Sequence, residues 1–408
     1  MLQKAQHKNL FSLFILLIIC SLPLPHNINN IFYFLFILYT VFFAVKYKIK
    51  PRFNRVIITF IFLYILMTLS YLWSIDKNLT LKGIGNKSAL FIIPLLFSFI
   101  PKFSSTQIRN IFKYFSYVLV LYALFFITIG SINYLSSNDI NVLAKHELVS
   151  PLGLNRIYVS LFTIVGVFHL IYNEKKTFTN NVLLSILIIF LLLLSSKNII
   201  ITSLISLVLL NSKSLVSLSK TKLTILSILL FVFSFLYINN NPAFYTELIP
   251  KKIKEVLVKK DFEKNYYFNG SELRILYTRF LYEFEEEDHI FFKGYGLNAT
   301  QEKLNQKCNE YRVPEGYGTT FNFHNQYNQT MAEIGFFGLL LLLIILFLSF
   351  KNAVHKKDKF TITVFIIFAS LMITESILNR QRGIYFFSII FLLLLNTKKP
   401  ISSTNPND

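Results

Sequence analysis

Long apolar runs without charge are the feature that most constrains how this chain can fold. One of them, FFGLLLLLIILFLSF at 336–350, contains no charged residue. In a helix, about 20 such residues match the ~30 Å hydrocarbon core of a bilayer. Similar runs recur along the chain, and 54% of its 408 residues are hydrophobic. The sequence therefore predicts an all-α polytopic membrane protein.

The apolar runs predict about twelve membrane helices. They lie at 9–24, 28–45, 56–73, 88–100, 111–131, 154–172, 181–195, 198–211, 223–238, 328–350, 360–376 and 383–396. The stretch 181–211 forms either one long helix or two short ones. The polar SSKN at 195–198 favours two, because a lysine at mid-bilayer costs about 2.5–3.5 kcal/mol. The N-terminal run has the composition of a signal peptide, but more spans follow at once, so we expect an uncleaved first helix.

The distribution of Lys and Arg orients these helices, because short cytoplasmic loops are enriched in positive charge. With the N-terminus inside, 21 of the 41 Lys and Arg lie in short cytoplasmic segments and eight in short outside loops. We therefore expect both termini in the cytoplasm. Residues 1–238 then hold nine helices, 239–327 one large outside loop, 328–396 three helices and 397–408 a cytoplasmic tail.

The net charge of +20 follows largely from this topology. The basic residues are scattered over short loops rather than collected on one folded face, so we expect membrane lipids as partners and no nucleic acid. With only Cys20 and Cys308, the chain has no disulfide framework.

The large outside loop is predicted to contain helices. Residues 243–264 predict a basic amphipathic helix, either on the membrane surface or solvated. A second helix is predicted from Ser271, a residue type that favours the N-cap. The acidic EFEEEDH at 283–289 ends it, and we interpret it as a solvated helix end rather than a metal site. The apolar positions with helical spacing are Leu273, Leu276, Tyr277, Phe280 and Phe284.

Polar and basic residues are expected to gather near the outer boundary of the membrane. Cations there suit an anionic, membrane-embedded substrate, because Arg and Lys neutralise phosphate oxygens. A histidine acts as acid or base near neutral pH. For each residue the alternative is a side chain that reaches the interface or a lipid phosphate. The set comprises Arg156, Lys197, Arg274, Arg279, His324, Asn325, Arg380 and Arg382.

Four stretches between about residues 60 and 390 form a recognisable set. HNQYNQTMAEIGFFGLLLLLI combines a His-Asn pair with Glu-x-Gly and a second glycine, at His324, Asn325, Glu333, Gly335 and Gly338. SELRILYTRFLYEFEEEDHIFFKGYGLN places an arginine before a Gly-x-Gly turn, YLWSIDKNLTL contains a Trp-Ser turn, and LLLLSSKNIIITSLIS joins two spans. Together they resemble the O-antigen ligase and O-antigen polymerase family of bacterial membrane glycosyltransferases. That family's span-joining turn usually reads Ser-Arg-Gly, where this chain has Ser-Lys-Asn at 196–198.

The resemblance implies a reaction at the periplasmic face of the bacterial inner membrane. A glycan on undecaprenyl diphosphate is moved to an acceptor hydroxyl, on lipid A–core in the ligases and on another glycan in the polymerases. The anomeric carbon inverts, and neither metal nor cofactor takes part. His324 is implied as base or orienting group, and Asn325 as the residue that fixes its ring.

The same resemblance implies cations that bind the diphosphate. Arg274 and Lys197 are implied first. Because lysine lacks the bidentate fork of arginine, Arg279, Arg382 or Arg156 are expected to share the task. Glu333 and Gly335 are interpreted as residues for helix start and packing.

Alternatives stay open at this point. An exopolysaccharide polymerase and a protein O-oligosaccharyltransferase share these motifs. A transporter often has twelve spans with both ends inside, although the spans here hold few charges, Glu375 being the clearest, and no half-to-half repeat is apparent. His324 also suits a cap of the helix that follows it.

Overall fold

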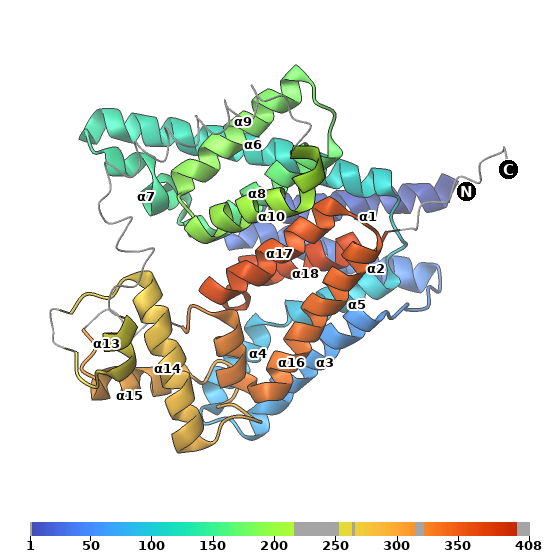
Figure 1. Ribbon diagram of the computed structural model, residues 1–408. Helices are drawn as coiled ribbons and strands as arrows, with labels where there is room; N and C mark the ends of the chain where they lie inside the picture. The colour runs from blue at the N-terminus through green and yellow to red at the C-terminus, as the bar shows by residue number, and fades with distance from the viewer. Residues whose placement is uncertain (1, 216–252, 263–265, 315–321, 398–408) are drawn as a thin grey trace.

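Helices make up the regular structure of this protein (Figure 1). The computed structural model describes residues 2–215, 253–262, 266–314 and 322–397. In these ranges there is no strand, only an isolated bridge between Phe103 and Thr397. The predicted all-α fold is therefore confirmed for this part of the chain.

The helices before residue 216 are α1 (Leu2–Cys20), α2 (His26–Lys46), α3 (Arg55–Leu69), α4 (Lys77–Asn86), α5 (Ala89–Phe99), α6 (Ser105–Ser137), α7 (Lys145–Val149), α8 (Arg156–Asn173), α9 (Phe178–Leu194) and α10 (Lys197–Leu215). Those after residue 252 are α13 (Ile253–Val258), α14 (Gly270–Asp288), α15 (Gln301–Glu310), α16 (Gln326–His355), α17 (Lys359–Thr374) and α18 (Gln381–Leu395). Four 3-10 turns join them: η1 (Ser70–Leu72), η2 (Ile140–Leu143), η3 (Ser150–Leu152) and η4 (Ile377–Asn379).

Six helical segments of the described chain are long and apolar enough to cross a membrane. They are α2, α3 with η1, α4 with α5, α6, α8 and α16. Shorter apolar helices of 10–17 residues occur in α1, α9, α10, α17 and α18. Helices thus occur at eleven of the twelve predicted ranges, and the range 223–238 lies outside the described residues. The polar helix α4 was not predicted.

Several of these helices expose apolar side chains, which indicates the kind of environment around the protein. On α2, Ile31, Phe34, Leu38, Phe42 and Val45 are each between 50% and 72% exposed. Exposed apolar side chains repeated along a helix need a nonpolar environment. The structure therefore supports a helical membrane protein.

The helices pack into one bundle around an aromatic centre. α16 packs against α3 and α17, α6 against α8, and α5 against α18. At the centre, the ring of Phe386 contacts those of Phe115, Phe162 and Phe368 at centroid distances of 5.9, 4.7 and 5.8 Å. These contacts join α6, α8, α17 and α18, so the bundle helices share one core.

The stretch 181–211 forms two helices, as the polar turn predicted. α9 ends at Leu194, and Ser195 adopts a left-handed conformation with φ 53°. α10 then begins at Lys197. The lysine therefore lies at a helix end and not inside a long span.

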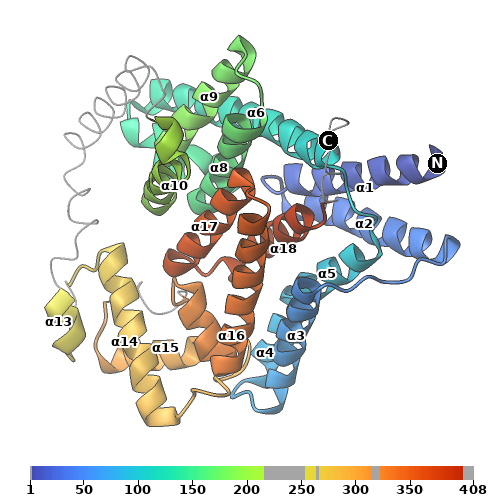
Figure 2. The ribbon, with the colours of Figure 1, turned by 45° about the vertical axis from the view of Figure 1, so that its right-hand side comes forward.

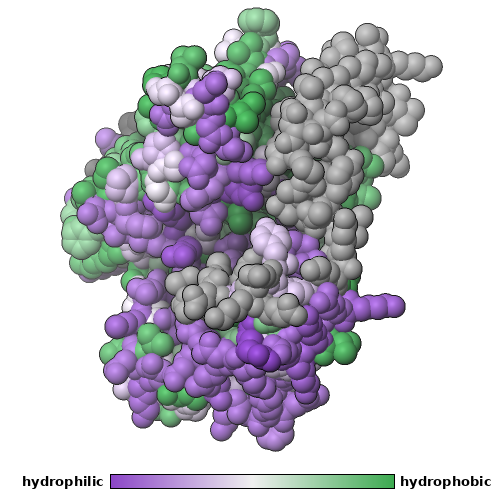
Figure 3. All heavy atoms as spheres, turned by 90° about the vertical axis from the view of Figure 1, so that its left-hand side faces the viewer, coloured by the Kyte–Doolittle hydropathy of each residue, from purple (hydrophilic) through white to green (hydrophobic). Residues whose placement is uncertain are grey.

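The described part of residues 253–325, here called the helical loop, has a core of its own. The predicted apolar stripe of α14 is buried, with Leu276 and Phe280 at 0% exposure, and Tyr277 contacts Phe323 edge-on. Figures 1 and 2 show α13–α15 beside the bundle, next to the start of α16. Figure 3 shows that hydrophilic residues cover the lower part of this face, where the helical loop lies.

The predicted cap of α14 was wrong by two residues. Asn269 and not Ser271 caps the helix, and its Oδ1 accepts hydrogen bonds from Ser271 N (3.0 Å) and Glu272 N (2.9 Å). In return, Asn269 N donates to Glu272 Oε2 at 3.1 Å, which completes a capping box. The cap falls on Asn269 because that residue is extended (φ −76°, ψ 166°), while Ser271 already lies inside the helix.

The predicted basic helix 243–264 ends earlier in the structure than we expected. Its described part, α13, ends at Val258, and residues 243–252 lie outside the described residues. Phe262 cannot continue the helix because its N–H donates to Tyr311 O (2.8 Å) and its ring is fully buried in the core of the helical loop.

A break inside α16 joins the helical loop to the bundle. Ile334 (φ −135°, ψ 16°) and Gly335 (φ 67°, ψ −167°) leave the helical conformation. The carbonyls before the break then accept bonds from the loop, Ala332 O from Tyr295 N (2.8 Å) and Glu333 O from Gly296 N (2.9 Å). After the break, Phe336 N donates to a loop carbonyl at 2.6 Å. The break thus satisfies the backbone of both segments.

The break depends on glycine at 335. Its dihedral angles belong to a region essentially restricted to glycine, and a Cβ there would lie 2.3 Å from the carbonyl of Phe292. We expect Gly335→Ala to lower the stability of the folded protein by about 3 kcal/mol or more, measured as a drop in melting temperature in detergent. Gly85→Ala is the control, because nothing lies within 4 Å of its added Cβ. Equal melting temperatures for the two variants would contradict this role.

Candidate functional site

Four segments of the chain meet at the C-terminal end of α17. Asn198 Nδ2 donates to Ser370 O (3.1 Å) from the start of α10. Tyr327 Oη donates to Ala369 O (2.8 Å) from the start of α16. Arg274 Nε, on α14, donates to Thr374 O (2.9 Å). These bonds bring the predicted residues Lys197, Arg274 and His324 to the same end of one helix.

His324 lies beside the carboxylate that follows α17. Its Nδ1 is 3.7 Å from Glu375 Oε2, and the two side chains are 24% and 9% exposed. The backbone of His324 is left-handed (φ 47°), and its N–H donates to Asn322 Oδ1 at 2.8 Å. The turn therefore directs the imidazole to Glu375, while part of the ring stays accessible.

Asn325 caps α16. Its Oδ1 accepts hydrogen bonds from Tyr327 N (2.9 Å) and Asn328 N (3.2 Å). Asn325 is therefore the N-cap of α16, and the alternative that His324 caps this helix is wrong. The described contacts of Asn325 do not include the ring of His324, and the residue is better explained by helix termination.

Arg274 is half-buried beside the same carboxylate. Its Nη1 donates to Gly270 O at 2.7 Å, in addition to the bond with Thr374. Burial lowers the pKa of Arg274, and the charge of Glu375 opposes that effect. The guanidinium, the imidazole and Glu375 thus form one cluster, called the His324 cluster below.

Arg279 lies elsewhere and holds the helical loop together. Its Nε pairs with Glu283 Oε1 at 2.9 Å, and its Nη1 donates to Val256 O (3.0 Å) and Lys259 O (2.6 Å). Its guanidinium also lies 4.8 Å from the ring centroid of Tyr311. Arg274 and Arg279 are five residues apart, so their side chains point about 140° apart around the helix, in agreement with their separate partners.

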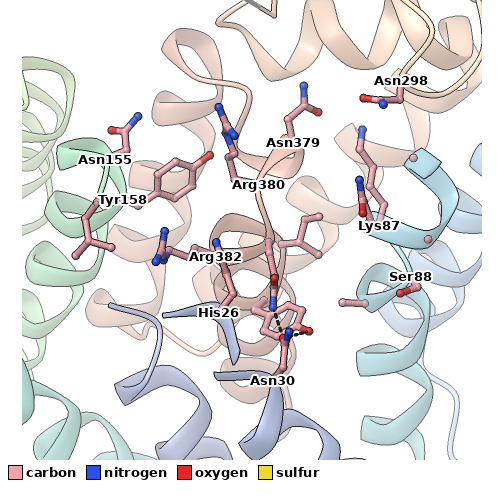
Figure 4. Close-up of a pocket in the computed structure, with 18 of the residues that line it drawn as sticks. His26, Asn30, Lys87, Ser88, Asn155, Tyr158, Asn298, Asn379, Arg380 and Arg382 are labelled. Carbon is pink, nitrogen blue, oxygen red and sulfur yellow. Dashed lines mark hydrogen bonds between the residues drawn. The ribbon is translucent and has the colours of Figure 1, made fainter. Parts of the chain in front are cut away.

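A cavity of about 650 Å³ borders the turn that follows Glu375, because Asn379 and Arg380 line it. His324, Arg274 and Glu375 are not among its lining residues. The N-terminal ends of α2, α5, α8 and α18 border it, together with α4. Figure 4 shows Arg380, Arg382, Lys87 and His26 around it. Its described lining contains no aspartate or glutamate. Cationic side chains and four helix N-termini give the cavity a positive potential, which favours anions.

Two polar atoms in the cavity wall lack a hydrogen-bond partner in the described chain. They are Tyr158 Oη, on a side chain 3% exposed, and Asn379 Oδ1. Buried polar atoms normally have a partner, so such atoms in a cavity wall indicate a place for a polar ligand. The charges of Glu375, Arg380 and Arg382 all act on the Tyr158 hydroxyl, so the cavity wall lies close to the His324 cluster.

The remaining predicted cations differ in their contacts. Arg382 lines the cavity, but its Nε and Nη2 donate to the carbonyls of Leu22 (2.8 Å) and Leu24 (3.2 Å), which fixes the α1–α2 connection. Arg156 begins α8 beside the cavity without lining it. Lys197 begins α10 near the end of α17. Arg380 is exposed within the cavity.

Sequence analysis missed a buried ion pair at the cavity wall. Lys87 Nζ lies 2.8 Å from Glu333 Oε2, with side chains 4% and 1% exposed. Gln329 Nε2 donates to the other carboxylate oxygen at 2.9 Å. The two charged residues are 246 positions apart, so no local pattern could have joined them. Glu333 precedes the break in α16, and the pair ties α4 to that break.

The structure thus gathers some of the predicted residues and separates others. His324 and Arg274 share the cluster at the end of α17, with Lys197 at the same end of the bundle. Arg382 lies in the cavity, whereas Arg279 belongs to the helical loop.

Comparison of the chain with models of protein families and with curated proteins found no match. Function is therefore inferred from the chemistry of these residues.

The Lys87–Glu333 pair should be sensitive to the loss of one partner. We expect Lys87→Ala to lower the free energy of unfolding by about 3–5 kcal/mol, because it leaves a buried carboxylate without a counter-charge. The double variant Lys87→Met/Glu333→Leu should recover much of that loss, because it leaves no unpaired charge. Thermal unfolding in detergent measures both. A single variant as stable as the wild type would show that Glu333 finds another partner.

Proposed function

We propose that this protein is a glycosyltransferase that moves a glycan from undecaprenyl diphosphate to an acceptor hydroxyl. The observation that carries the proposal is the carboxylate-free cationic cavity beside the His324–Glu375 pair. A cavity of about 650 Å³ suits a diphosphate with part of its glycan. The partly exposed imidazole next to it supplies a proton acceptor.

In this mechanism the positive charge acts where negative charge develops. The diphosphate binds beside Arg380 and Arg382, which line the cavity, with Arg274 and Lys197 approaching from the end of α17. As the bond between the anomeric carbon and the diphosphate oxygen breaks, these cations offset the charge on the leaving undecaprenyl diphosphate. Tyr158 Oη and Asn379 Oδ1 would complete their hydrogen bonds on the ligand.

His324 acts on the acceptor in the same step. Its imidazole accepts the proton of the acceptor hydroxyl as that oxygen attacks the anomeric carbon from the side opposite the diphosphate, so the configuration inverts. Glu375 orients the ring and balances its charge while it carries the proton. The proton passes to solvent after the product leaves. No step requires a metal or an organic cofactor.

The proposed setting is the bacterial inner membrane, with about twelve spans and both termini in the cytoplasm. The helical loop and the cavity then face the periplasm, where the diphosphate headgroup of an outer-leaflet lipid lies. The acceptor is lipid A–core if the protein is a ligase, which is the preferred form of the proposal. A polymerase or protein O-oligosaccharyltransferase uses the same donor site, and lipopolysaccharide banding in a deletion strain separates these acceptors.

The orientation can be measured with introduced cysteines. Tyr267→Cys, at a position 71% exposed in the helical loop, should react with a membrane-impermeant maleimide in cells whose outer membrane alone is permeabilised. Lys176→Cys, an exposed position between α8 and α9, should react only after lysis. The reverse pattern would put the helical loop in the cytoplasm and remove the proposed donor from the site.

The catalytic role of His324 can be separated from a structural one. We expect His324→Ala to reduce turnover at saturating donor by about 10²–10⁴-fold, because a base contributes by that factor, with little change in melting temperature. Asn325→Ala should instead cost about 1 kcal/mol of stability, the usual value of an N-cap, and Asn325→Ser should restore it. Transfer of a lipid-linked glycan by purified protein measures the rates. Normal turnover of His324→Ala per folded molecule would remove His324 from the mechanism.

A further inference from the structure

A second cavity lies at the opposite end of the bundle from the candidate site. The helices α5 and α18 each begin at the first cavity, at Ala89 and Gln381, and each ends at the second. The second cavity has a volume of about 480 Å³ and also borders the start of α3 and the later part of α16. It is separate from the residues of the proposed reaction.

The polar part of this cavity is basic. Arg52, Arg55 and Lys102 line it, and its described lining contains no carboxylate. Arg52 Nη2 donates to Ile100 O at 3.0 Å, which fixes the segment before α3 against the end of α5. Arg55 and Lys102 are exposed. Three cations around one hollow can neutralise a phosphate group.

Most of the remaining lining of the cavity is apolar. Leu348, Leu392 and Leu395 form part of the wall. Beyond it, Phe62 on α3 and Phe347 on α16 are 54% and 62% exposed. A ligand with a charged head and hydrocarbon chains would contact both the basic and the apolar parts, whereas a free anion would contact only the basic part.

We propose that this cavity binds the headgroup of an anionic phospholipid. Its phosphate lies among Arg52, Arg55 and Lys102, and the Asn352 and Asn396 amides meet the remaining polar groups of the head. The acyl chains follow the apolar faces of α3 and α16. By the positive-inside rule this leaflet is the cytoplasmic one, and basic pockets between membrane helices on that side are suited to anionic headgroups.

This proposal is independent of the proposed reaction. The cavity requires only a bilayer around the bundle, because its cations, its apolar wall and its position at the helix ends define the ligand. The bound lipid would contact α3, α5, α16 and α18. It would hold these helices together at the end of the bundle opposite the first cavity. Its contribution should therefore appear as lipid-dependent stability of the bundle.

The test uses the full chain purified in detergent, with lipid binding counted by native mass spectrometry and stability followed by thermal unfolding. Phosphatidylglycerol should bind and raise the melting temperature, while phosphatidylcholine and inorganic phosphate should not. Arg55→Gln/Lys102→Gln should weaken phosphatidylglycerol binding by about thirtyfold, given the attraction expected per basic residue near a charged headgroup. Arg55→Lys should retain most of the binding, because it keeps the charge.

Lys175→Gln/Lys176→Gln is the matched control, because it removes the same charge from another exposed basic turn outside the cavity. It should bind phosphatidylglycerol like the wild type. Equal weakening of both double variants would mean that only the overall charge matters, and would overturn the proposal. Stabilisation of the wild type by inorganic phosphate to the same extent as by phosphatidylglycerol would overturn it too, because the apolar wall would then play no part. Equal binding of phosphatidylcholine would exclude recognition of an anionic head.

Discussion

The backbone break at Ile334 and Gly335 is the constraint on which the arrangement of the site depends. A continuous α16 would use the carbonyls of Ala332 and Glu333 within the helix, and the loop amides of Tyr295 and Gly296 would then lose their partners. With the break, those amides are satisfied and the helical loop is fixed to the bundle. α14, and with it Arg274, is thereby held against the end of α17. The cluster around His324 is assembled from segments that no single helix could bring together.

The positively charged residues of the protein fall into groups with different tasks. Arg279 is saturated by Glu283 and two carbonyls, so its charge is committed to the fold of the helical loop. Arg382 has two roles, because it borders the cavity and also donates to two carbonyls of the α1–α2 connection. Arg380, two residues earlier, is exposed in the same cavity. Position in the sequence alone does not distinguish these tasks, because most of the acceptors that decide them come from remote segments.

Sequence analysis predicted the helices better than the site, for physical reasons. Apolar runs and the stripe of α14 are local patterns, so the ranges of the helices and the burial of Phe280 could be inferred. The separate directions of Arg274 and Arg279 followed from helical geometry. In contrast, the cap at Asn269 rather than Ser271 depends on where the chain enters the helix. The pairing of Lys87 with Glu333 and the place of Tyr158 depend on which helices become neighbours, which amphipathicity does not specify.

The helices that carry the site are short for a membrane. α17 has 16 residues and α18 has 15, so at 1.5 Å per residue each is about 24 Å long or less, against a hydrocarbon core of ~30 Å. Both helices are largely buried by their neighbours, so few of their side chains contact lipid. Because a short helix ends before the hydrocarbon boundary, Glu375 and Arg380 would lie below the level of the lipid headgroups. In the proposed reaction, the diphosphate of the donor would therefore enter the bundle while the polyprenyl tail stays in the bilayer.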